Sequence, residues 1–126
     1  MTAPAPRVYE AHARSTDVFG RVLCNARTQH FVVDGPEQNG CPGEAVTPAE
    51  LFLSGVAACG VELLQVLAKN QQTPLRAARV TIRGVNDPAH PVRSDVNLFN
   101  SVHLAFTLSG VSEEAGEALI AAFKRR

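Results

Sequence analysis

The chain has 126 residues, and its twelve basic residues balance its twelve acidic residues, so the formal net charge is zero. A chain of this length is expected to form one domain around a core of moderate size. Balanced charge gives no general attraction to nucleic acid or to anionic lipid, which argues against both as partners. We therefore expect a single domain over residues 1–126 that binds neither.

Residues 1–7 contain two prolines and no apolar run, so we expect a disordered lead-in there rather than a secretory signal. No segment is expected to reach the length of a transmembrane helix. The three cysteines, Cys24, Cys41 and Cys59, show no paired spacing, which argues against a disulfide framework and against a zinc ribbon. A reducing, cytoplasmic location is the resulting expectation.

Three short strands are predicted in the first third of the chain. Residues 8–15 alternate weakly, and residues 21–25 and 30–33 are rich in valine and phenylalanine. We expect these strands to form a meander. The following loop, 34–44, is rich in glycine and proline, which predicts no regular structure. It lacks the Gly-Lys-Ser/Thr ending of a phosphate-binding loop.

A long helix is predicted over residues 47–70. Thr47 can serve as the N-cap with Pro48 at the first helical position, and Glu50 three residues after the cap completes a capping box. Its polar positions form one narrow stripe: Ser54, Glu62, Gln65 and Lys69. A helix this apolar must be covered nearly all round. A second copy of the chain is the simplest source of that cover, so we expect a homodimer.

Two further strands and a final helix are predicted in the rest of the chain. Residues 76–84 and 101–109 alternate between apolar and polar side chains. Ser112 is a candidate N-cap for a closing helix whose apolar residues recur at helical spacing. The order of strands, helix, strands and helix predicts an α+β fold.

Cys59 is the first candidate for chemistry, because it lies among small residues on the long helix. A buried cysteine is usually a small core side chain. The alternative is a nucleophile, which would need a nearby cation such as an arginine to ionise the thiol. Glu50 is explained by its capping role, and its functional alternative is to hold such an arginine. Cys41, in a flexible and solvent-accessible loop, is either incidental or a partner for an oxidised Cys59.

The remaining polar residues suggest no metal or cofactor. The four histidines are scattered without paired spacing: His12, His30, His90 and His103. No nucleotide-binding glycine pattern or hydrolase motif is present. Cys24, in a predicted strand, is assigned to the core.

Several segments together resemble the OsmC/Ohr family of osmotically inducible and organic hydroperoxide resistance proteins. They are HFVVDGP over 30–36, Gly40, TPAELFLSGVAAC over 47–59, PL at 74–75 before the strand 78–84, and LSGVSEE over 108–114. The resemblance runs from about Val8 to the end of the chain. It implies antiparallel sheets wrapped around the central helix in an intertwined homodimer. It also implies a peroxidatic cysteine at Cys59, flanked by an arginine and a glutamate, and an external dithiol reductant.

The chain departs from the family pattern in three ways. The second family cysteine would follow the last helix, where this chain ends at Arg126, so either the chain is shortened or the resolving step differs. The glutamate of the hydroperoxide resistance branch aligns with Ala49, while Glu50 matches the broader OsmC-like branch. The flanking arginine has no fixed motif, so Arg21 is the candidate and Arg14 the alternative.

The leading hypothesis is a thiol peroxidase that reduces organic hydroperoxides in oxidative stress defence, with Cys59, Glu50 and Arg21 as catalytic residues. Recycling would use Cys41 as resolving cysteine or an external thiol. The alternative is a dimeric small-molecule-binding or stress-associated protein without turnover. A disulfide-exchange or acyl-transfer enzyme is a third idea, although no histidine is visibly placed to serve it.

Overall fold

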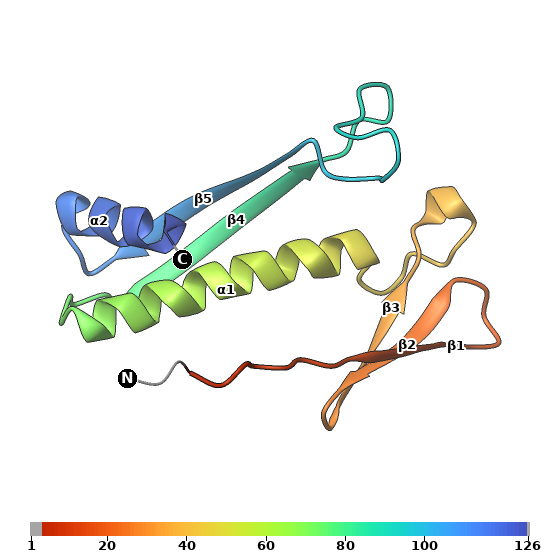
Figure 1. Ribbon diagram of the computed structural model, residues 1–126, viewed down its shortest axis with the longest axis horizontal. Helices are drawn as coiled ribbons and strands as arrows, with labels where there is room; N and C mark the ends of the chain where they lie inside the picture. The colour runs from red at the N-terminus through yellow and green to blue at the C-terminus, as the bar shows by residue number, and fades with distance from the viewer. Residues whose placement is uncertain (1–3, 126) are drawn as a thin grey trace. The chain divides into compact units, whose positions relative to one another are not determined.

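The computed structural model describes residues 4–125 and divides into two compact units, one ending at Leu51 and one starting at Phe52. The element order is β1, β2, β3, a short 3-10 helix η1, α1, β4, β5 and α2 (Figure 1). Of the predicted lead-in, residues 4–7 are exposed and have no regular structure, and residues 1–3 lie outside the described part. The fold contains two antiparallel sheets and a long helix, which confirms the α+β prediction.

The N-terminal unit contains the predicted three-stranded meander. Its strands are β1 (His12–Ser15), β2 (Arg21–Ala26) and β3 (Gln29–Asp34), paired antiparallel in that order. β1 begins four residues later than predicted, because β2 turns at Arg27, where φ is 53°, and leaves residues 8–11 without a partner strand. Val8 and Tyr9 are accordingly 89% and 84% exposed.

The loop after β3 is more ordered than its composition predicted. Glu37–Asn39 form the single 3-10 turn η1, and Gly40 closes it in the left-handed region with φ 78°. Backbone bonds from Cys41 to Pro36 and from Gly43 to Gly35 fold the loop back on itself. The glycines therefore permit specific turns here instead of excluding structure.

Helix α1 (Pro48–Asn70) begins with the predicted capping box. The Glu50 carboxylate accepts a 2.9 Å hydrogen bond from the Thr47 backbone N–H, and the Thr47 hydroxyl accepts one of 3.3 Å from the Glu50 N–H. These reciprocal bonds satisfy two polar N–H groups at the start of the helix.

The C-terminal unit packs the rest of α1 with a hairpin and a helix. β4 (Ala77–Val85) pairs antiparallel with β5 (Ser101–Ser109), and α2 (Glu113–Lys124) follows with Ser112 as its N-cap. The core cluster is Leu64, Leu67, Ala68 and Leu119. Phe106 of β5 and Phe123 of α2 add an edge-to-face pair with ring centroids 5.6 Å apart.

Much of α1 remains uncovered in the single chain. Its buried residues are confined to the second half: Gly60, Leu64, Leu67 and Ala68. Phe52 is 57% exposed and Val66 37% exposed. The helix is also long and apolar enough to cross a membrane by length and composition, so the expectation that no segment reaches that length was wrong. The prediction failed because the few charges of α1 lie near its ends and along one stripe.

Candidate functional site

Cys59 is exposed on α1 in the single chain, so the chain itself does not hold it as a packed core atom. The next residue, Gly60, is buried, and a Cβ there would lie 3.5 Å from the Phe106 ring and 3.6 Å from the Phe123 ring. Gly55, one turn before Cys59 on the same helix face, has open space where a side chain would be. The small residues therefore leave room beside the sulfur.

Glu50 is exposed at the first turn of α1, nine residues before Cys59. Its pKa is lowered below the ordinary value, first by the hydrogen bond from the Thr47 backbone N–H and then by one from the Thr47 side chain, against a smaller opposing effect of desolvation. The carboxylate is therefore ionised at neutral pH and can accept further hydrogen bonds.

Arg21 is held by two carboxylates of the N-terminal unit. Its Nε donates to Asp34 Oδ1 at 2.8 Å, and its Nη2 donates to Asp34 Oδ2 at 2.9 Å and to Glu44 Oε1 at 3.1 Å. Hydrogen bonds to Asp34 and then to Glu44 raise the arginine pKa. These contacts use Nε and Nη2, so Nη1 takes no part in them. The Arg21 side chain is 30% exposed.

Asp34 is the residue that sequence reasoning did not assign. It is fully buried, and it also accepts hydrogen bonds from the Glu44 N–H at 3.0 Å and the Ala45 N–H at 2.8 Å. The hydrogen bond from Arg21 is the main cause that holds its pKa well below the usual range, against desolvation. Arg21 and Asp34 are direct cross-strand partners, and opposite charges at such positions are the signal that would have found the pair.

Cys41 is half-buried, and backbone hydrogen bonds hold the loop that carries it. A Cβ on Gly20 would lie 2.4 Å from its sulfur, and one on Gly35 would lie 2.5 Å from it. Cys41 is thus packed against two residues that must lack side chains. Cys24 on β2 is also half-buried.

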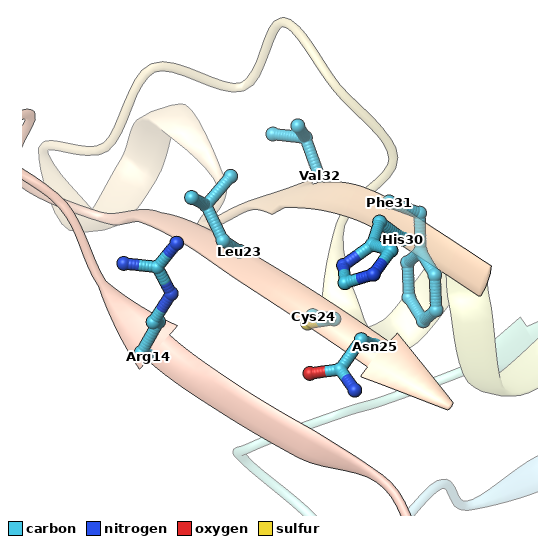
Figure 2. Close-up of a pocket in the computed structure, with 7 residues that line it drawn as sticks. All are labelled: Arg14, Leu23, Cys24, Asn25, His30, Phe31 and Val32. Atoms are coloured by element: carbon cyan, nitrogen blue, oxygen red, sulfur yellow. The ribbon is translucent and has the colours of Figure 1, made fainter. Parts of the chain in front are cut away.

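Arg14, the alternative arginine, lies beside a half-open hollow of about 230 Å³ on the N-terminal sheet (Figure 2). Arg14, Leu23 and Val32 are cross-strand neighbours and project from the same face. The hollow is completed by Cys24, Asn25, His30 and Phe31. Neither Cys59 nor Glu50 lines it.

The structure therefore groups Arg21 with Asp34 and Glu44, and it groups Glu50 with Thr47. Cys59 belongs to the C-terminal unit, while the other candidates belong to the N-terminal unit. Within residues 4–125, no three histidine, cysteine, aspartate or glutamate side chains gather in a way that could hold a metal ion. The assignment of Cys59, Glu50 and Arg21 to one site remains a prediction.

Solved structures share the fold at low sequence identity. An OsmC-like protein from Mycoplasma pneumoniae is 16% identical with a TM-score of 0.81, covering 97% of this chain and 84% of its own. An organic hydroperoxide resistance protein OsmC from Legionella pneumophila is 24% identical with a TM-score of 0.72, covering 95% and 84%. An organic hydroperoxide resistance protein from Elizabethkingia anophelis is 19% identical with a TM-score of 0.75, covering 98% and 85%.

The sequence itself identifies the family. No curated protein matches the chain. The family profile described as OsmC-like protein matches residues 41–126, about two thirds of the chain, including all of α1 and the C-terminal unit. In this fold α1 is the core helix of a soluble protein rather than a membrane span. The chain therefore belongs to the OsmC-like protein family.

Proposed function

We propose that this protein is a thiol-dependent peroxidase that reduces organic hydroperoxides, with Cys59 as the attacking nucleophile. The observation that carries the proposal is an exposed thiol with open space beside it, on the helix that carries the TPAELFLSGVAAC motif. Structural neighbours from Legionella pneumophila and Elizabethkingia anophelis bear the name organic hydroperoxide resistance protein, which supports a role in peroxide defence.

The reaction begins when the Cys59 thiolate attacks the terminal oxygen of the hydroperoxide. The O–O bond breaks, the sulfur takes up an OH group to form a sulfenic acid, and the departing alkoxide takes a proton and leaves as an alcohol. A dithiol then reduces the sulfenic acid to the thiol, releases water and becomes a disulfide. Where Cys41 acts as the resolving thiol, it attacks the Cys59 sulfenic acid, releases water and forms a Cys41–Cys59 disulfide, which the external dithiol then reduces.

Arg21 and Glu50 are the proposed partners of the thiolate. Arginine keeps its charge at all relevant pH values and can stabilise a thiolate by a charge-assisted hydrogen bond. Asp34 and Glu44 fix the Arg21 side chain and leave Nη1 over for such a bond. Arg14 is the alternative, and substitution of each arginine by lysine would distinguish the two by the loss of turnover.

We also propose a cytoplasmic homodimer of single OsmC-like domains. The exposed apolar side chains of α1, including Phe52 and Val66, support this proposal because a second copy would cover them. Sedimentation at micromolar concentration tests it, and a monomer there would overturn it.

The second candidate function is ligand binding without turnover on the same fold. Two observations favour it: Ala49 stands where the hydroperoxide resistance branch has its glutamate, and Arg21 is already paired with two carboxylates. In this case Cys59 would alkylate slowly and with the pH dependence of an ordinary thiol. A thiol-labelling rate measured against pH separates the two candidates.

The direct test is consumption of cumene hydroperoxide in the presence of a dithiol. We expect Cys59→Ser to abolish turnover, while Cys24→Ser, which removes a half-buried thiol of the sheet, retains it. Circular dichroism of both variants controls for folding. Equal rates in wild type and Cys59→Ser would refute the peroxidase proposal.

A further inference from the structure

We propose that Asp34 is a positioning residue, which acts through the start of α1 to hold Glu50 in place. Asp34 lies at the end of β3 and Glu50 in the first turn of α1, and the segment between them contains η1 and the loop that leads into the helix. The functional part of this inference rests on the proposed peroxidase activity. The structural part can be measured without it.

The Asp34 carboxylate is saturated by donors. Oδ1 accepts from Arg21 Nε at 2.8 Å. Oδ2 accepts from Arg21 Nη2 at 2.9 Å, from the Glu44 N–H at 3.0 Å and from the Ala45 N–H at 2.8 Å. A carboxylate with no exposed surface and four donors fixes the groups that it binds, because each alternative orientation would leave a buried charge without partners.

The same residue fixes the backbone that runs into the helix. The Asp34 N–H donates to the Val46 carbonyl at 3.0 Å, so Asp34 binds three consecutive residues, Glu44 to Val46. The next residue is Thr47, whose N–H and hydroxyl form the capping box with Glu50. No unconstrained residue separates the buried carboxylate from the cap. Asp34 therefore sets the position from which the Glu50 carboxylate is presented.

Asp34→Asn is the variant that isolates this role, because it preserves size and shape. Both carboxylate oxygens face only donors, so the new NH₂ group meets a donor in either orientation of the amide. A matched control exists in Asp95, which makes the same two-bond contact with Arg93 in an exposed loop of the C-terminal unit. Asp95→Asn removes an equivalent pair away from the α1 start.

The first readout is the titration of the Glu50 side chain by NMR. Its pKa lies below the ordinary value in the folded chain because Thr47 donates to it. We expect Asp34→Asn to move the Glu50 pKa back toward the ordinary value and Asp95→Asn to leave it unchanged. An unchanged Glu50 titration in folded Asp34→Asn protein would overturn the proposal, whatever the protein does with peroxides.

The second readout is a double-mutant cycle between Asp34→Asn and Glu50→Gln in peroxide turnover. If Asp34 acts through Glu50, each single variant lowers kcat/KM and the double variant is hardly worse than Glu50→Gln alone. Multiplicative losses in the cycle would show that Asp34 acts on turnover through Arg21, which it also binds, and would overturn its action through Glu50. Absence of turnover in the wild type would refute the peroxidase proposal alone, because the Glu50 titration would still decide the inference.

A measurement on the wild type covers the case in which Asp34→Asn does not fold. The Glu44 and Ala45 amides should exchange with solvent at least about tenfold more slowly than an unstructured peptide, because a buried carboxylate accepts both. Unprotected amides at these two positions would overturn the proposal.

Discussion

At the scale of single residues, the arrangement around Arg21 matters most. Arg21 is the predicted cation of the site, and the structure shows it bound to Asp34 and Glu44. Sequence analysis did not assign Asp34 a role, although the register pairs it directly with Arg21. The burial of Asp34 depends on the loop that folds over it. The pattern of apolar and polar residues along the strand does not show where that loop lies. The register therefore indicates the pairing of Arg21 with Asp34, but it does not indicate that Asp34 is buried, and the role of Arg21 beside Cys59 stays a prediction.

The buried carboxylate makes stability depend on pH. The pKa of Asp34 is lowered in the folded chain, mainly by the hydrogen bond from Arg21, and returns to about 3.9 on unfolding. Because the folded value is the lower one, the unfolded chain takes up the proton first as the pH falls. The stabilisation by Asp34 is therefore complete above about pH 5 and is lost progressively on further acidification.

The Asp34→Asn variant has no carboxylate at this position, so it cannot lose the stabilisation by Asp34 on acidification. We expect the difference in urea midpoint between wild type and Asp34→Asn to be constant above about pH 5 and to shrink toward about pH 3. Glu50 also has a lowered pKa, and because we expect Asp34→Asn to move it toward the ordinary value, its contribution to the difference is also lost on acidification and has the same sign. A difference that stays constant over the whole range would contradict the account of Asp34.

At the scale of elements, the boundaries of α1, β4 and β5 follow their local signals closely. The capping box, the alternation of 101–109 and the Ser112 cap all appear in the structure. The loop over residues 35–46 is more ordered than its glycine and proline content predicts. Glycine lowers the predicted order of a segment, but here the glycines allow close packing of the loop. The Cys41 side chain packs so closely against Gly20 and Gly35 that a Cβ atom on either glycine would clash with it.

This packing gives a prediction for the loop. Gly35→Ala places a methyl group against the Cys41 thiol, so we expect a loss of about 1–3 kcal/mol in the free energy of unfolding. Cys41→Gly in the same chain removes the clash and should recover part of that loss. Gly55→Ala is the control, because its Cβ would meet open space.

Urea denaturation measures all three variants. Equal stability of Gly35→Ala and wild type would show that the loop does not pack on Cys41 as described. A Gly35→Ala/Cys41→Gly double variant that is no more stable than Gly35→Ala would show that the clash lies elsewhere.

At the scale of the whole molecule, the family was predictable because the helix motif and the segments around it are specific, and the profile match confirms it. The exposure of Cys59 was not predictable. The sequence places the thiol in an apolar helix, and the burial of that helix depends on which surfaces the single chain supplies. The buried residues of α1 all lie in its second half, and Cys59 lies just before the first of them. The thiol is therefore exposed in the single chain, which supports the peroxidase proposal.

The most direct measurement is the fate of one equivalent of cumene hydroperoxide added to the reduced protein without any reductant, followed by intact mass and peptide mapping. We predict that the peroxide disappears and that each chain either gains one oxygen atom, which a sulfenic acid reagent traps on Cys59, or loses two hydrogen atoms as a Cys41–Cys59 disulfide forms. Peroxide that persists in the presence of reduced wild-type protein, or an oxygen that appears equally in Cys59→Ser, would contradict it.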